Sequence, residues 1–204
     1  MRRPSGRLPR RGRAAKRAPR YILRVLTEGE RTEPDYLFVW VRRNAGVHLD
    51  IADRGMTPDA LVRRAKEHLK GQPRRRAARD FDEIWCVFDT DEHENLPQAI
   101  EEARRSGVKV AVSNPCFELW LVLHRREQTA YIDRRDVQRL SNELGLSDDK
   151  RIPNAARNTL VEAFPTAKER AQALDRRHAD NDSPARENPS TDVWRLVDQL
   201  RDGP

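Results

Sequence analysis

Three carboxylates follow two apolar segments of this sequence, at a spacing that suits metal chemistry. Glu28 comes directly after residues 21–27, and Asp89 and Asp91 come one and three positions after Phe88. Residues i and i+2 of an extended chain point to the same side, so the two aspartates would face one ligand together. Carboxylate oxygens suit Mg²⁺ and Mn²⁺, and crowded carboxylates repel unless a cation neutralises them. The pattern therefore indicates a divalent-metal site if the two segments are neighbours.

The elements that must position these acids alternate between strands and helices. Apolar, β-branched runs predict strands over 21–27, 49–52, 83–88 and 108–113. Apolar residues at helical spacing predict helices that open at Thr32, which would be the N-cap, at Thr57 and near Pro97. This alternation predicts an α/β domain with a largely parallel sheet flanked by helices. Ligands of such sheets gather outside the carboxyl ends of the strands, where all three acids fall.

The second half of the chain is predicted to be helical. Residues 116–124 are too long and apolar a run for a surface element and predict a buried helix. Further helices are expected over 134–144, 156–164 and 167–178, and a last one begins after residue 189 with Ser190 or Thr191 as its N-cap. We expect a single domain from residue 21 to 204 whose helical portion starts at about residue 125.

Two further acids are candidates for a second metal position. Glu33 lies in the first turn of a predicted helix, close to Glu28 along the chain. Glu118 is the only charge between Pro115 and Leu123, and a nearly buried acid needs a ligand or a partner. A structural pair with an arginine explains Glu118 nearly as well as a metal does.

The histidines and cysteines carry weaker signals. His93 and His124 could transfer protons at neutral pH, although a single histidine near a loop or helix end is more often structural. Cys86 and Cys116 lie in apolar stretches without a metal-binding spacing, which indicates reduced core residues, with a zinc site as a remote alternative. No apolar run approaches the ~20 residues that span a bilayer, and no secretory signal is recognisable, so we expect a soluble cytoplasmic protein.

The net charge of +7 belongs to one end of the chain. Residues 1–20 hold nine Arg and Lys and no acid, and subtracting these from the net charge leaves −2 for the remaining 184 residues. This arm has little apolar content and is expected to be disordered. It suits attraction to a nucleic-acid backbone, and a solubilising extension explains it equally well. Its candidates for phosphate contacts are Arg10, Arg11 and Arg13.

A second basic cluster lies in a predicted loop after the helix that opens at Thr57. Such a cluster is more often a solvated loop, although it could flank a phosphate path. Its candidates for nucleic-acid contacts are Arg74, Arg75 and Arg76. Lys150 and Arg151 could also meet a phosphate, with little in the sequence to mark them.

Four stretches resemble the RloB-like family, and they match in order between residue 21 and about residue 200. They are 25–34 (VLTEGERTEP), 85–93 (WCVFDTDEH), 113–121 (SNPCFELWL) and 188–193 (NPSTDV). The family is regarded as having a Toprim-like fold, shared with primases, topoisomerases and OLD-type nucleases. The resemblance implies that Glu28 is the Toprim glutamate and that Asp89 and Asp91 are its DxD pair.

The resemblance also implies a biological setting. Members of the family are considered nucleases of antiphage defence and are found beside an AAA-type ATPase partner. Glu33 is similar in position to a second acid of OLD-type sites, although its spacing from Glu28 differs by one residue.

Three functions are compatible with these features. The leading one is a Mg²⁺- or Mn²⁺-dependent nuclease acting on DNA or RNA, with Glu28, Asp89 and Asp91 as catalytic residues. The second is a non-catalytic nucleic-acid-binding or sensor subunit of a defence complex. The third is a haloacid-dehalogenase-type phosphatase with Asp89 as nucleophile. That fold places its DxD after the first strand and follows it with Gly-Thr, whereas here Glu92-His93 follows, so it ranks last.

Overall fold

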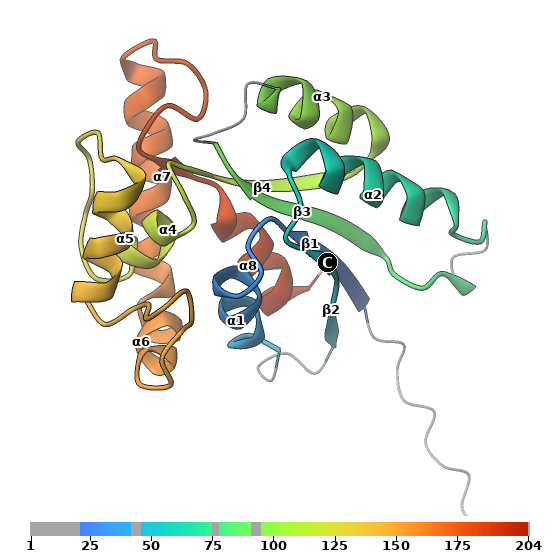
Figure 1. Cartoon of the computed structure of the whole chain (residues 1–204), viewed down its shortest axis with the longest axis horizontal. Helices are drawn as coiled ribbons and strands as arrows, with labels where there is room; N and C mark the ends of the chain where they lie inside the picture. Colours follow the sequence, from blue (N-terminus) through green and yellow to red (C-terminus); the bar gives the residue numbers. More distant parts are fainter. Residues whose placement is uncertain (1–20, 42–45, 75–77, 91–94, 204) are drawn as a thin grey trace, which may run out of the picture.

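The fold is an α/β arrangement on a mostly parallel sheet (Figure 1). The computed structural model describes residues 21–41, 46–74, 78–90 and 95–203. Within these ranges the sheet has five strands, in the spatial order β2-β1-β3-β4-β5. They are β1 (Tyr21–Thr27), β2 (Val47–Arg54), β3 (Glu83–Asp89), β4 (Lys109–Asn114) and β5 (Ser190–Thr191). Strands β1 to β4 are parallel and β5 is antiparallel to β4, which confirms the predicted sheet.

Helices cover both faces of this sheet. On one face lie α2 (Pro58–Lys70) and α3 (Leu96–Ser106), and on the other lie α1 (Thr32–Phe38) and α8 (Val193–Asp202) (Figure 1). Most of the helices predicted after residue 125 gather with α4 (Glu118–Leu123) at one side of the sheet, and we call this group the helical portion (Figure 1). Its other members are α5 (Arg134–Glu143), α6 (Ala156–Glu162) and α7 (Phe164–Asp180). In the described residues no helix is both long and apolar enough to cross a membrane.

Strand β3 shows why the strands are apolar at nearly every position. Trp85 and Val87 pack into the core under α1, α4 and α8, while Cys86 and Phe88 pack into the core under α2 and α3. Because successive side chains of a strand point to opposite faces, a strand covered on both faces must be apolar throughout. Cys86 is therefore a core residue, as predicted, and burial raises the pKa of its thiol to about 12.

Two predicted helix caps are wrong. Ser190 and Thr191 do not cap α8 but form β5, paired with Asn114 and Ser113 of β4. The helix begins two residues later, after Asp192, whose backbone N–H also donates to the Val112 carbonyl (3.0 Å). Sheet hydrogen bonds hold this segment extended, and local spacing could not reveal a partner strand about eighty residues away.

Thr32 is likewise not a cap. It is the first residue of α1, and its hydroxyl donates to the Lys150 carbonyl (3.1 Å). The hydroxyl therefore joins the start of α1 to the helical portion of the chain instead of satisfying the helix end.

Candidate active site

The ends of β1 and β3 bring Glu28 and Asp89 together. The two strands are paired neighbours, and the Glu28 N–H extends their pairing by donating to the Val87 carbonyl (2.9 Å). The Asp89 N–H in turn donates to Oε2 of Glu28 (2.9 Å). These two acids, 61 positions apart in the sequence, therefore lie side by side at the carboxyl edge of the sheet, as the two strand-end motifs predict. Asp91, the third acid of the prediction, lies outside the described residues, as does His93.

Gly29 brings Glu33 to the same edge. The Gly29 N–H donates to Oε1 of Glu33 (2.9 Å), and Glu33 is only 4% exposed. A Cβ atom added to Gly29 would lie 1.9 Å from Oε2 of Glu33, which is a severe overlap. The Glu33 carboxylate therefore occupies the space that a side chain at position 29 would take, and a larger residue there would have to displace it.

Glu118 completes the acidic cluster from α4. It is the first residue of the helix, is 7% exposed and lines the same cavity as Glu28, Glu33 and Asp89. Among the described residues no arginine or lysine forms an ion pair with it. The alternative of a structural arginine pair is therefore not what the described part of the structure shows.

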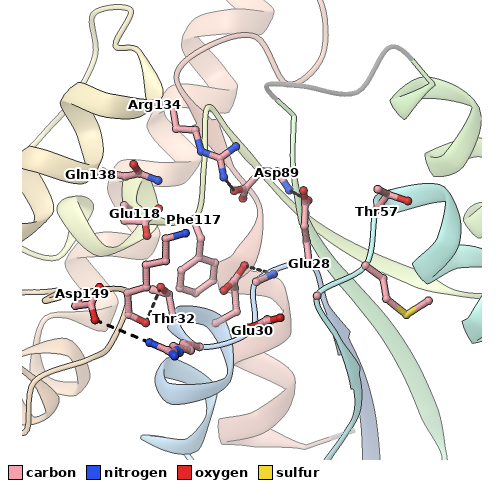
Figure 2. A pocket seen from close by; sticks show the side chains of 16 residues that line it. Glu28, Glu30, Thr32, Thr57, Asp89, Phe117, Glu118, Arg134, Gln138 and Asp149 are labelled. Atoms are coloured by element: carbon pink, nitrogen blue, oxygen red, sulfur yellow. Dashed lines mark hydrogen bonds and ion pairs between the residues drawn. The ribbon is translucent and has the colours of Figure 1, made fainter.

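The four acids face a cavity of about 640 Å³ (Figure 2). In Figure 2, Glu118, Gln138 and Asp149 are on one side of the view and Thr57 is on the other, with Asp89 between them. Glu28 comes from β1, Glu33 from α1, Asp89 from β3 and Glu118 from α4. The cavity thus joins the edge of the sheet to the helical portion.

Burial and repulsion disfavour the charged forms of Glu33 and Asp89. The pKa of Glu33 is raised to about 7 by burial first, with further raising contributions from the neighbouring Glu118 and Glu28 that outweigh the hydrogen bond from Gly29. The pKa of Asp89 is raised well above its usual range by burial first and then by Glu33, Glu118 and Glu28. Arg134 opposes this shift, with its guanidinium 3.7 Å from the Asp89 carboxylate. A cation bound in the cavity, in addition to the Arg134 guanidinium, would reduce the remaining repulsion between these carboxylates.

The donor set fits a hard divalent cation, although the side chains do not form a finished coordination sphere. All four are carboxylates, the ligands that Mg²⁺ and Mn²⁺ prefer. Within the described residues, no three His, Cys, Asp or Glu side chains lie close enough together to hold one ion as they stand. Glu28 and Glu33 instead accept backbone N–H groups, so binding would have to draw these carboxylates toward the ion.

The helical portion adds cationic and amide groups to the cavity. Arg134 and Gln138 of α5 and Lys150 of the following loop line it. Of these, sequence reasoning marked Lys150 only faintly and missed the other two. Arg134 is one of many arginines in the chain, and only its position beside Asp89, visible in Figure 2, distinguishes it.

A tight turn presents Lys150. Asp148 and Arg151 exchange two backbone hydrogen bonds (both 2.9 Å), so Asp149 and Lys150 form the two-residue tip. Both tip residues have positive φ, 43° and 59°, a region that non-glycine residues rarely adopt. Positive φ at both central residues is what a two-residue primed turn between antiparallel segments requires.

This turn is fastened to α1. Thr32 donates to the Lys150 carbonyl, Arg31 lies 3.9 Å from Asp149, and Arg151 lies 3.7 Å from Asp35. The ties hold the tip at the cavity. The Lys150 side chain itself makes no ion pair or hydrogen bond within the described residues, although acids surround the cavity that it lines.

Among the predicted nucleic-acid contacts, Arg74 is described by the structure and does not line the cavity. Arg74 is exposed and follows α2, so it lies at the amino edge of β3, opposite the edge that carries Asp89. Arg75 and Arg76, together with Arg10, Arg11 and Arg13, lie outside the described residues. The nucleic-acid contacts of these arginines remain predictions.

His124 and Cys116 are core residues. His124 is 3% exposed, its Nδ1 donates to the Trp120 carbonyl (2.9 Å), and burial lowers its pKa to about 4. Cys116 is fully buried, and burial first, then Glu118 and Asp89, raise the pKa of its thiol. Neither side chain lines the cavity.

Fold and cavity together define a class: α/β proteins with an acidic site at the carboxyl edge of a mostly parallel sheet. Residues 23–200 match the family model described as RloB-like protein, which covers most of the chain. The chain therefore belongs to the RloB-like protein family. No curated protein and no solved structure matches it.

Proposed function

We propose that the protein is a metal-dependent nuclease that cleaves phosphodiester bonds of DNA or RNA. The observation that carries the proposal is the convergence of Glu28, Glu33, Asp89 and Glu118 on one cavity at the carboxyl edge of the sheet. The resemblance to the RloB-like family implies that Glu28 is the Toprim glutamate and that Asp89 is the first aspartate of the DxD pair. The same resemblance supports a role in antiphage defence beside an AAA-type ATPase.

The residues divide into a metal-binding and a phosphate-binding face. Glu28 and Asp89 would hold Mg²⁺ or Mn²⁺, with Asp91, Glu33 and Glu118 as further ligands. When bound, the ion would neutralise negative charge at the phosphate and lower the pKa of a water molecule bound to it. Arg134, already 3.7 Å from Asp89, is placed to meet a phosphate oxygen as well. Lys150 and Gln138 line the side of the same cavity that the helical portion forms. There they bind the neighbouring part of the nucleic-acid backbone.

Cleavage assays with and without metal test the proposal. The full chain, alone and with a candidate AAA-type ATPase partner, is incubated with labelled DNA and RNA in Mg²⁺, Mn²⁺ or EDTA. We expect cleavage of at least one substrate with either metal and none in EDTA. Cleavage that persists in EDTA contradicts the metal-dependent mechanism. If both substrates stay intact under every condition while still binding, the non-catalytic binding or sensor role is favoured instead.

Lys150 provides a second, smaller test. Replacing it with methionine keeps most of the side chain's length but removes a charge from the phosphate-binding face. A charge-assisted hydrogen bond contributes about 1.5–3 kcal/mol, so we expect kcat/KM to fall by roughly 10- to 150-fold, mainly through KM. The salt dependence of KM should also become shallower.

Lys66→Met is the matched control for this variant. Lys66 is a lysine of α2 whose ammonium pairs with Glu102, and it does not line the cavity. Its replacement should leave kcat/KM unchanged. Equal kinetics for Lys150→Met and Lys66→Met would show that Lys150 does not contact the substrate.

A further inference from the structure

Tyr131 is an exposed aromatic side chain that the proposed chemistry does not use. Among the described residues, the large hydrophobic side chains that are exposed are those of Tyr131 (73%) and Phe38 (47%). The Tyr131 ring lies in the connection between α4 and α5. Within the described residues it makes no aromatic, cation–π or hydrogen-bond contact.

The backbone on both sides of this ring is held in place. Before it, Arg177 donates to the Thr129 carbonyl (3.1 Å), and the Gln128 side chain donates to the Ala130 carbonyl (2.9 Å). After it, the Asn188 amide accepts from the Ile132 N–H (3.1 Å) and donates to the Ile132 carbonyl (2.8 Å). A fixed backbone that displays a free ring lowers the entropy cost of binding a partner.

The ring belongs to the segment that leads into Arg134, a residue that lines the cavity. Arg134 follows Tyr131 by three positions, starts α5 and reaches the Asp89 carboxylate. Three residues of chain span at most ~10 Å. Figure 1 shows this connection running beside α5 on the side of the molecule where α4 and α7 lie. A strand with one phosphate at Arg134 can therefore place a nearby base on the Tyr131 ring.

We infer that the substrate is a single-stranded nucleic acid, one base of which stacks on Tyr131. The inference rests on the proposed function and names its substrate class. Every base has a π-face, so an aromatic platform beside cationic side chains binds unpaired strands with little regard to sequence. A duplex keeps its bases stacked on one another and cannot offer a face to the ring without unstacking. Arg134 and Arg135, directly after the connection, supply positive charge for the backbone.

The test measures binding in EDTA, so it does not depend on cleavage. Fluorescence anisotropy of the full chain with a labelled 12-nucleotide single strand, and with the matching duplex, is recorded at physiological salt. We expect Tyr131→Ala to weaken single-strand binding by about 5- to 150-fold. Duplex binding should stay unchanged, and Tyr131→Phe and Tyr131→Trp should retain single-strand affinity.

Phe38→Ala is the matched control, because Phe38 is the other exposed aromatic and lies at the end of α1. It should bind both ligands as the wild type does. Unchanged single-strand affinity in Tyr131→Ala overturns the inference. Contact with a protein partner would then be the explanation for the exposed ring. Equal losses for strand and duplex overturn it as well. Selective loss of strand binding without any cleavage by the wild type would sustain this inference while contradicting the nuclease.

Discussion

Replacing Glu28 with glutamine or Asp89 with asparagine is expected to lower phosphodiester cleavage by about a thousandfold or more. Each change removes one carboxylate from the point where β1 and β3 end. Metal-ion stabilisation of a transition state is worth several kcal/mol, and every 1.36 kcal/mol is a factor of ten in rate. Single-turnover cleavage in Mg²⁺ measures the loss.

Both substitutions should leave the fold intact. The amide oxygen of Gln at position 28 can still accept the Asp89 N–H, and Asn at position 89 relieves a buried charge whose pKa is already raised by burial. Asp192→Asn is the matched control. Asp192 is also buried, but it accepts from Arg186 and Val112 and lies outside the cavity, so cleavage should persist. Wild-type rates in Glu28→Gln and Asp89→Asn would refute the site assignment.

Replacing Glu33 with glutamine is expected to make the metal-free protein more stable at neutral and alkaline pH. Burial raises the pKa of Glu33 from 4.5 to about 7, so the folded state disfavours its charged form. At ~1.4 kcal/mol per pKa unit, the charge costs at most about 3.5 kcal/mol well above pH 7. In a chain of this size that corresponds to an increase in Tm of up to about 14 °C in EDTA. Gln at position 33 can still accept the Gly29 N–H.

The sign of the pH dependence makes this prediction specific. Because the folded-state pKa of Glu33 is raised, its stabilising contribution is complete below pH 4.5 and is lost as the pH rises through about 7. The difference in Tm between variant and wild type should therefore be absent below pH 4.5 and largest above pH 7. Thermal unfolding in EDTA across this range measures it.

Glu101→Gln and added metal complete the experiment. Glu101 is exposed and bound by Arg104 and Arg105, which lower its pKa to about 2, so its replacement should not raise the Tm. Mg²⁺ should raise the Tm of the wild type more than that of Glu33→Gln, because a ligand that binds only the folded state stabilises it. A lower Tm for Glu33→Gln than for the wild type at pH 8 would contradict the free-energy cost that we assign to the buried charge of Glu33.

Local patterns were sufficient to place the first two acids. The segments before Glu28 and Asp89 are apolar at most positions because β1 and β3 pack into the core on both faces of the sheet, with Arg24 as the charged exception in β1. Alternation with helices makes those strands parallel, and parallel strands end at one edge. The sequence therefore placed Glu28 and Asp89 at the same edge of the sheet, and only the pairing of β1 with β3 made them neighbours.

Only the tertiary structure decided what else shares that edge. The Glu33 carboxylate lies at this edge in the space beside Gly29, which has no side chain. Glu118 lies there because the start of α4 is buried against the sheet edge. Lys150 lies there because its turn is hydrogen-bonded to α1. None of these contacts has a periodic signal, because each depends on how a helix or turn packs against a distant element. The same reason explains the wrong N-cap at Ser190 and Thr191, which pair with β4. The spacing of residues along the chain determined where the strands end. The packing of distant elements against one another determined which side chains line the cavity.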